Sequence, residues 1–442
     1  MKTLHRLIQQ VGFNALCRCR KVSFISRLSF PPLAWFGQRR AELLILLFIL
    51  LLPFGEASHL PVAMLVLLGI QDIRRNGFSI NFDSKIFLGI ALTLIAPLLI
   101  SAIGAYDISK TLRTALVFTL YSIAGVYVVR QFRERVDIDL VLYGISGILL
   151  FWTADALLQY FHGTNIFGWP GRIDGITGIY DRKLWIGYTF AHLAPFLFES
   201  LRRWAAKPGF KWSWLLAIPF IMVGMLSGRR AAWVTLGLVS SIYLIWLIRH
   251  GDIKLRHALV GVVAFFIAIG ATVAISPDLQ LRVQTSMYVF SGTWDRVNAA
   301  GANRLEVWQG AWMLYKESPL AGVGVNAYDP LVFERGYTAS KYGHTHLYGL
   351  DVLLSTGVIG FAAFMAVFFY LCFKLVQSVK WALPTLPAWL AAVSIMFPLN
   401  AHWSFYAPRS ASLLWMLLIL AIAFAAHYRS HRVLTRNASQ NR

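Results

Sequence analysis

The sequence is poor in charged residues, and in acids above all. Only 14% of its 442 residues are charged, whereas soluble domains have about 25%. Acids number 20 and basic residues 41, which gives a net charge of +21. The basic residues are spread over many short segments, with no basic patch of a nucleic-acid-binding fold. We therefore expect no nucleic-acid partner.

Cysteine is also scarce. The three cysteines, Cys17, Cys19 and Cys372, fall where the topology described below has the cytoplasm or its membrane face. No cysteine is then available for a disulfide in the large loop on the other side. Cys17-x-Cys19 has no nearby cysteine or histidine partners, so a zinc site is not expected there.

Apolar residues, by contrast, are abundant. They make up 57% of the chain, the mean hydropathy is +0.60, and there are 16 Trp, a residue suited to the membrane interface. Because a membrane-spanning helix needs about 20 mostly apolar residues, the sequence predicts an all-α polytopic membrane protein with about 12 transmembrane helices and one large periplasmic loop that contains helices. The expected spans are 41–55, 58–73, 85–105, 111–130, 138–160, 184–201, 212–228, 230–249, 257–276, 348–373, 384–402 and 409–428.

The distribution of basic residues sets the expected orientation. Residues 1–40 are basic, carry no acid and lack the apolar run of a cleavable signal peptide. Placing both termini in the cytoplasm puts most Lys and Arg on the cytoplasmic side. The first two spans, joined by Gly55-Glu56-Ala57, could instead form a tight hairpin. The expected segments are a cytoplasmic arm (1–40), helices one to nine (41–276), a periplasmic loop (277–347), helices ten to twelve (348–428) and a cytoplasmic tail (429–442).

The loop 277–347 is the only long segment outside the expected spans. Leu305, Trp308, Trp312 and Tyr315 recur at helical spacing and predict a helix over 303–317 with one apolar face. Asn303 is expected to cap it, with Glu306 as the reciprocal partner. The helix lies either on the membrane surface, with its two Trp in the interface, or packed on top of the bundle. In both arrangements the loop covers the membrane domain.

Two histidines end this loop, directly before the tenth span. If His346 lies in the first helical turn, the helix dipole favours its neutral form, as a general base requires. Alternatively, it is an interfacial histidine that hydrogen-bonds a loop carbonyl. A metal site formed with His344 lacks an obvious third ligand.

Adjacent arginines, Arg229 and Arg230, lie between two apolar runs on the expected outer side, where basic residues are disfavoured. A guanidinium matches phosphate oxygens, although both side chains could simply snorkel to the interface. Other outward residues could join them in a basic, aromatic-rimmed cavity for an anionic lipid head group such as pyrophosphate. These are Arg172, Arg182, Lys183, Arg304, Asn400, His402 and Arg409.

Several segments resemble the O-antigen ligase and polymerase superfamily of bacterial inner-membrane proteins. His346 followed by Gly357-Val-Ile-Gly360 resembles its histidine and Gly-x-x-Gly signature. The stretch 303–308, followed by 319–324, is similar to the loop segment before that histidine. Gly228-Arg229-Arg230-Ala231 is similar to its Ser-Arg-Gly/Ala motif, with Arg229 where the family often has Ser and Leu347 where it often has Asn. Residues 175–183 loosely match its glycine-rich outer loop.

This resemblance implies transfer of a glycan from undecaprenyl pyrophosphate to lipid A–core oligosaccharide, on the periplasmic face of the inner membrane. It implies no nucleotide, metal or other cofactor. On this basis Arg230 and Arg304 are assigned to the pyrophosphate, and His346 is assigned as general base with His344 as second choice. Inverting displacement is favoured, since no carboxylate pair is evident outside. An O-antigen polymerase, a pilin oligosaccharide transferase and a lipid-linked oligosaccharide flippase remain alternatives.

Overall fold

The computed structural model describes residues 33–77, 80–134, 137–301, 304–338, 342–401 and 403–440. The chain divides into two units at Arg40. Of the first unit, the structure describes the short helix α2 (Leu33–Gln38) and the residues up to Arg40. Most of the expected N-terminal arm, including Cys17 and Cys19, lies outside the described residues.

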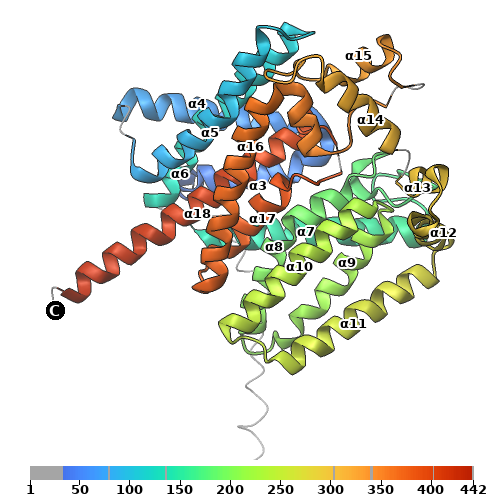
Figure 1. Cartoon of the computed structure of the whole chain (residues 1–442). Helices are drawn as coiled ribbons and strands as arrows, with labels where there is room; N and C mark the ends of the chain where they lie inside the picture. The colour runs from blue at the N-terminus through green and yellow to red at the C-terminus, as the bar shows by residue number, and fades with distance from the viewer. Residues whose placement is uncertain are drawn as a thin grey trace, which may run out of the picture. The chain divides into compact units, whose positions relative to one another are not determined.

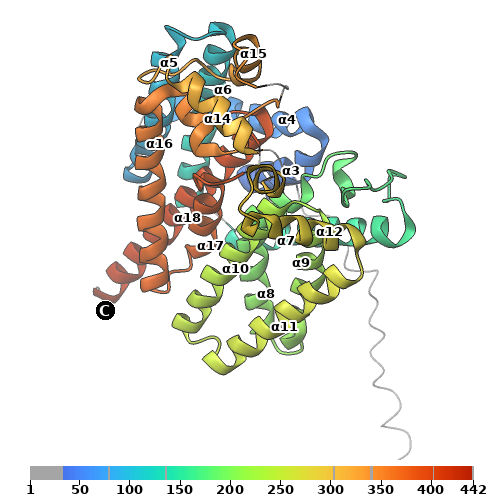
Figure 2. The same ribbon diagram turned by 45° about the vertical axis from the view of Figure 1, so that its right-hand side comes forward.

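The second unit is built of helices, and its described residues include no β-strand beyond two isolated bridges. Figures 1 and 2 show their arrangement. The elements are α3 (Arg40–Leu51), η1 (Leu52–Ser58), α4 (His59–Asn76), α5 (Phe82–Ala102), α6 (Ile108–Glu134), α7 (Ile138–His162), η2 (Gly178–Tyr180), α8 (Ile186–Ala205), η3 (Lys211–Leu216), α9 (Ala217–Leu226), α10 (Arg230–His250), α11 (Leu255–Ala274), α12 (Pro277–Met287), η4 (Tyr288–Phe290), α13 (Trp294–Ala300), α14 (Arg304–Tyr315), α15 (Tyr328–Glu334), α16 (Tyr348–Lys380), α17 (Leu386–Met396) and α18 (Pro408–Gln440).

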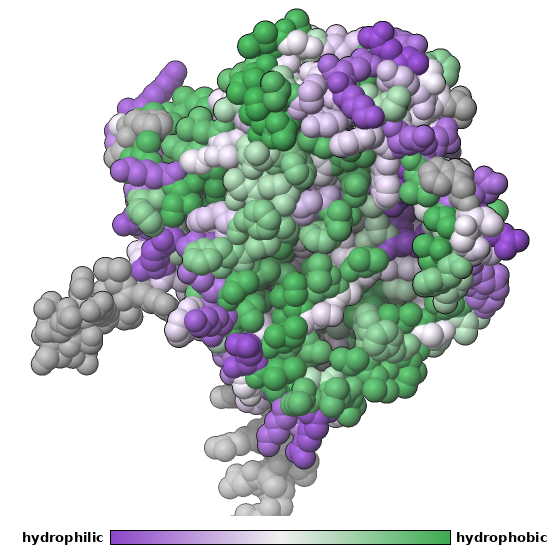
Figure 3. Space-filling model, in the orientation of Figure 1, coloured by the Kyte–Doolittle hydropathy of each residue, from purple (hydrophilic) through white to green (hydrophobic). Residues whose placement is uncertain are grey.

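Eight helical segments among the described residues are long and apolar enough to cross a membrane. This confirms the prediction of an all-α polytopic membrane protein. The first two expected spans form one continuous segment, Arg40–Asn76, which bends at Gly55 (φ 69°, ψ −116°). Figure 3 shows hydrophobic side chains over α10, α11 and the middle of α16, and hydrophilic ones around α14 and α15.

Three expected spans are not among these eight segments. They are 184–201, 212–228 and 384–402, which correspond to α8, to the short apolar segment Lys211–Leu226 and to the short helix α17. For α8 the reason is its environment, because every residue from Ile186 to Leu201 is buried by other helices. A helix that meets protein on all sides needs no continuous apolar surface, and α8 accordingly carries His192 and Glu199.

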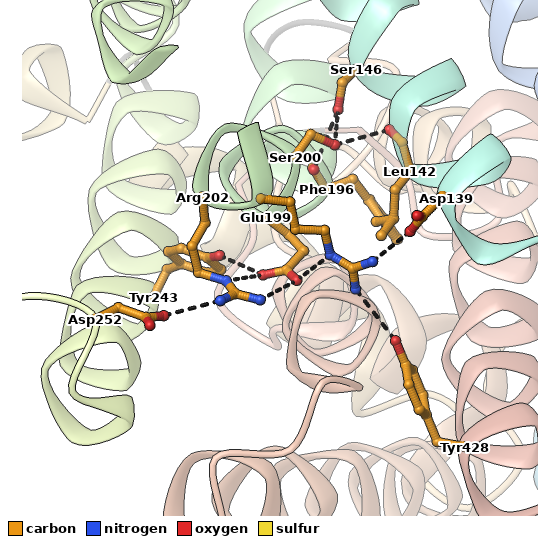
Figure 4. Close-up of polar contacts among 11 residues, drawn as sticks. Asp139, Leu142, Ser146, Phe196, Glu199, Ser200, Arg202, Tyr243, Asp252 and Tyr428 are labelled. Carbon is orange, nitrogen blue, oxygen red and sulfur yellow. Dashed lines mark hydrogen bonds and ion pairs between the residues drawn. The ribbon is translucent and has the colours of Figure 1, made fainter. Parts of the chain in front are cut away.

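A buried ion network joins α8 to its neighbours at the end of the bundle opposite the 277–347 loop (Figure 4). Glu199 is 0% exposed and accepts hydrogen bonds from Arg202 at 2.8 Å, Arg203 at 2.7 Å and the Tyr243 hydroxyl at 2.8 Å. The two arginines extend the network to α7, to the loop after α10 and to α18, through Asp139, Asp252 and Tyr428. Each charge is thus paired, which a buried ion requires.

At the opposite end, α16 is interrupted at Gly357 (φ 64°, ψ −169°). The segment 319–324 packs against this break and hydrogen-bonds to its backbone on both sides. Val323 and Gly324 donate to the carbonyls of Leu354 and Ser355, and Val358 and Ile359 donate to those of Pro319 and Leu320. A Cβ at position 357 would collide with the Leu320 carbonyl. Glycine is therefore required there by its positive φ and by this close backbone approach.

Replacing Glu199 with Ala is expected to lower the free energy of unfolding by about 3 kcal/mol, because it leaves two partly buried arginines without their shared acceptor. The melting temperature of the purified protein in detergent measures the effect. Glu134→Ala, at an exposed position at the end of α6, is the control. Equal melting temperatures for the two variants would contradict the role given to the network.

Gly357→Ala is expected to destabilise the protein by about 2 kcal/mol, from the positive φ and the contact with Leu320. Gly147→Ala is a matched control, because a Cβ added at that helical glycine meets nothing within 4 Å. Thermal unfolding in detergent compares the two. If Gly357→Ala is as stable as Gly147→Ala, then the break in α16 does not depend on glycine.

Candidate active site

A cavity of about 550 Å³ lies between the start of α10 and the helices of the 277–347 loop. Four arginines line it: Arg229, Arg230, Arg282 and Arg304. No Asp or Glu is among its described lining residues. The remaining wall is largely apolar and includes Val234, Val289, Val297, Leu305, Phe397 and Leu399.

The arginines are held mainly by neutral oxygens. Arg230 donates to the Ala300 carbonyl at 2.7 Å and to the Ser286 hydroxyl at 2.9 Å. Arg304 donates to the Ala401 carbonyl at 3.1 Å, and Arg282 donates to the Asp174 carbonyl at 2.7 Å. Carbonyls and hydroxyls orient a guanidinium without cancelling its charge. The cavity therefore keeps a strong positive potential, which suits a polyanion.

Asp174 compensates this charge only in part. Its carboxylate is 2.7 Å from Arg172 and 3.9 Å from Arg229. Burial opposes ionisation of Asp174, but the hydrogen bond from Arg172 and the charges of Arg172 and Arg229 outweigh it and lower its pKa. For Arg304, burial has the larger effect. Burial, together with the charges of Arg230 and Arg229, lowers the pKa of the Arg304 guanidinium despite the opposing effect of Tyr188.

Local geometry explains how Arg229 and Arg230 reach the cavity. Gly228 has a φ of 69°, and a Cβ there would collide with the Asp174 carbonyl. This glycine turns the chain into α10, with Arg229 as N-cap and Arg230 as the first helical residue. A helix N-terminus disfavours cations and favours bound anions. Two arginines at this position are therefore better explained by a ligand than by helix stability.

The histidine pair stands beside the cavity without lining it. The rings of His344 and His346, both half-buried, are 3.9 Å apart between centroids. Trp308, which lines the cavity, donates to the carbonyl of Thr345 at 3.0 Å and so ties the pair to the cavity wall. His346 has a φ of 53° and precedes α16, which starts at Tyr348. His346 therefore lies just before the first helical turn, because Leu347 is the N-cap, and the condition for an effect of the helix dipole is not met.

The helix predicted over 303–317 is present as α14, Arg304–Tyr315. It packs against α15 and α16 and buries Val307, Gly310, Ala311 and Leu314, while Trp308 and Tyr315 of the predicted apolar face are half-buried. Trp312 is exposed, and its ring lies 5.1 Å from that of Tyr315.

A residue outside α14 helps to cap its start. Asn298 accepts a hydrogen bond from the backbone N–H of Leu305 in the first turn, at 3.2 Å. The Glu306 carboxylate accepts one from the Tyr342 hydroxyl. The expected cap, Asn303, lies outside the described residues, so its pairing with Glu306 stays a prediction.

The other proposed ligand-binding residues take different positions. Asn400 lines the cavity, but its side-chain amide is bound to the carbonyls of Ser394 and Ile395. Four cations do not line this cavity: Arg172 is paired with Asp174, Arg182 is exposed, and Lys183 and Arg409 lie over the Trp185 ring. His402 lies outside the described residues. Within the part of the chain that is described, no group of three or more His, Cys, Asp or Glu could hold a metal ion.

Arg282 is the one of the four cavity arginines that the sequence did not reveal. It lies on α12, which the sequence marks only as part of a long loop. Nothing in the run Leu281-Arg282-Val283 distinguishes it from an ordinary surface arginine. It is brought to the cavity by the Asp174 carbonyl and by its packing at Gly228, 3.4 Å from an added Cβ.

Comparison with known proteins relates this region to one family. Residues 214–365 match a family model described as O-antigen ligase. The matched segment contains the four cavity arginines, both histidines and the break at Gly357. A search of curated proteins finds no match to the chain.

Inorganic pyrophosphate is expected to bind the purified protein and raise its melting temperature. Arg304→Gln is expected to weaken this binding about tenfold, since a charge-assisted contact to an anion contributes roughly 1.5–3 kcal/mol. Calorimetric titration measures the affinity. Arg335→Gln, at an exposed position on the same loop, is the control. Failure of the wild-type protein to bind, or equal loss in the control, would contradict this use of the cavity.

Proposed function

We propose, from the premise that residues 214–365 belong to the O-antigen ligase family, that this protein is an O-antigen ligase. It transfers a glycan from undecaprenyl pyrophosphate to lipid A–core oligosaccharide. The reaction takes place on the periplasmic face of the bacterial inner membrane, with both termini in the cytoplasm. The observation that carries this proposal is the cavity, in which four arginines converge and no acid is among the described lining residues.

The donor's anion fits the charge of the cavity. A lipid pyrophosphate carries several negative charges, and pairs of its oxygens can accept two parallel hydrogen bonds from one guanidinium. In the reaction, the bond between the anomeric carbon and the pyrophosphate oxygen breaks, and negative charge develops on that oxygen. Arg230 and Arg304 stabilise this leaving group, and their fixed hydrogen bonds to carbonyls preorganise them for it.

The donor's lipid fits the apolar wall. Val234 on α10 and Leu399 after α17 both line the cavity and are 68% and 65% exposed. Apolar side chains exposed on a membrane-spanning helix face lipid. The wall thus gives a polyprenyl chain a route from the bilayer to the arginines.

His346 acts as the general base, with His344 as second choice. It removes the proton from an acceptor hydroxyl as the hydroxyl oxygen attacks the anomeric carbon from the side opposite the pyrophosphate. One such displacement inverts the anomeric centre. Support comes from Trp308, which lines the cavity and holds Thr345 between the two histidines. Alignment of the two substrates supplies much of the rate, since the leaving group is already activated.

An O-antigen polymerase or a pilin oligosaccharide transferase would use the same donor, and the acceptor distinguishes these enzymes. A flippase has less support, because it would need charged residues free in the middle of the membrane. Asp351 accepts hydrogen bonds from Ser404 and from the Phe405 backbone at 2.7 Å, and Asp155 accepts one from Ile166 at 3.0 Å. Both acids therefore hold loops in place.

Deletion of the gene is expected to abolish every O-antigen band on a lipopolysaccharide gel, while glycan accumulates on the lipid carrier. A core that bears a single repeat unit would identify a polymerase instead. Unchanged lipopolysaccharide would exclude both activities. Complementation then tests the residues: His346→Ala and Arg230→Ala should reduce transfer about a hundredfold or more.

Two matched variants control this complementation. His162→Ala, at the exposed end of α7, and Arg335→Ala, on the surface of the outer loop, should restore the wild-type bands. Membrane extracts probed for each variant verify insertion. Wild-type transfer by His346→Ala would remove the assignment of the base while leaving the ligase assignment intact.

A further inference from the structure

A row of aromatic rings leads away from the arginine cavity. Its first member, Tyr188, lines the cavity. The Trp403 ring lies 5.3 Å from that of Tyr188, and the Trp185 ring lies 4.7 Å from that of Trp403, in both cases edge to face. Trp185 and Trp403 are half-buried. We call Tyr188, Trp403 and Trp185 the aromatic row.

Cations gather at the far end of the aromatic row. The Arg409 guanidinium carbon is 3.7 Å from the centre of the Trp185 ring, and the Lys183 ammonium is 4.7 Å from it. Gly55 leaves room for this arrangement, because a Cβ there would lie 2.6 Å from an Arg409 nitrogen. The Arg409 guanidinium thus stacks on the Trp185 indole in a space that Gly55 leaves open.

Arg409 has no acidic partner among the described residues. It forms no ion pair in that part of the chain, and its Nη1 is buried without a hydrogen-bond partner there. Two acids lie close in sequence to its neighbours, Asp181 two residues before Lys183 and Glu56 directly after Gly55, and both are exposed. A buried guanidinium nitrogen normally has an acceptor. No described residue therefore neutralises the charge of Arg409.

The aromatic row is also joined to the catalytic side of the cavity. Tyr348, two residues after His346, donates its backbone N–H to the Asn400 carbonyl at 3.0 Å. Asn400 and Ala401 line the cavity, and Trp403 is two residues after Ala401. A molecule that lies along the row would therefore bring one end to the cavity, near the start of α16.

The geometry points to the aromatic row, with Arg409 and Lys183, as the binding site for the acceptor: the phosphorylated saccharide head group of a glycolipid. Indole and phenol rings stack on the C–H faces of sugars, and a guanidinium whose charge is not neutralised by an acid binds phosphate. The four cavity arginines already account for the donor's pyrophosphate. This inference rests on the proposed transfer function, which needs a second, saccharide substrate beside the first.

Steady-state transfer by the full-length protein in nanodiscs tests the proposal, with each substrate varied in turn. Trp403→Ala is expected to raise the acceptor KM about tenfold, because a lost stacking contact is worth roughly 1–1.5 kcal/mol. The donor KM should change less than about twofold. Trp403→Phe should restore most of the affinity. Equal effects on both KM values, or no effect on either, would overturn the assignment.

Arg409 is tested by direct binding, which does not require turnover. Arg409→Gln should weaken binding of phosphorylated acceptor about tenfold and leave binding of enzymatically dephosphorylated acceptor unchanged. If wild-type protein binds acceptor through these residues yet transfers nothing, the proposed function fails and this site stands. If Arg409→Gln and Trp403→Ala only lower the melting temperature, the row is an interfacial anchor and the proposal is overturned.

Discussion

The break in α16 at Gly357 governs how the outer loop is attached to the membrane domain. Peptide groups cannot be left unpaired in a low-dielectric region, where each costs several kcal/mol. The segment 319–324 supplies their partners by packing its own backbone against the break. This fixes the chain just after α14, and α14 carries Arg304 at its start. The position of a cavity arginine thus depends on backbone pairing at a glycine far along the chain.

The cavity arginines have to be held together although like charges repel in a poorly hydrated space. The protein holds Arg230, Arg282 and Arg304 with carbonyl and hydroxyl oxygens, which fix geometry but leave the charge intact. At the other end of the bundle, Glu199 lies between two arginines, and the charges are paired. The paired charges around Glu199 thus serve packing, whereas the cavity arginines keep their charge for a ligand.

Much of this could be predicted from the sequence. Apolar runs gave the helical membrane class, and Arg230 and Arg304 stood out because they follow a glycine turn and start a periodic segment. Arg282 could not be found, since its role arises from a long-range contact with Asp174. The start of the tenth span was expected at 348, where α16 begins, but the positive φ of His346 leaves no mark in residue type. The buried face of α14 could not be read from its large apolar residues, because small residues allow the close approach to α16.

The complete burial of α8 has a consequence for how the protein is made. Polar and ionised groups such as His192, Glu199, Arg202 and Arg203 reduce the free energy that this segment gains from lipid by itself. Its partners lie on both sides of it in sequence: Asp139 comes earlier, and Tyr243, Asp252 and Tyr428 come later. Of the two acids outside α8 that balance the arginines, Asp139 is therefore present when α8 is made, whereas Asp252 is made only after α10. The network of α8 is completed after its own synthesis, when α10 and finally α18 arrive.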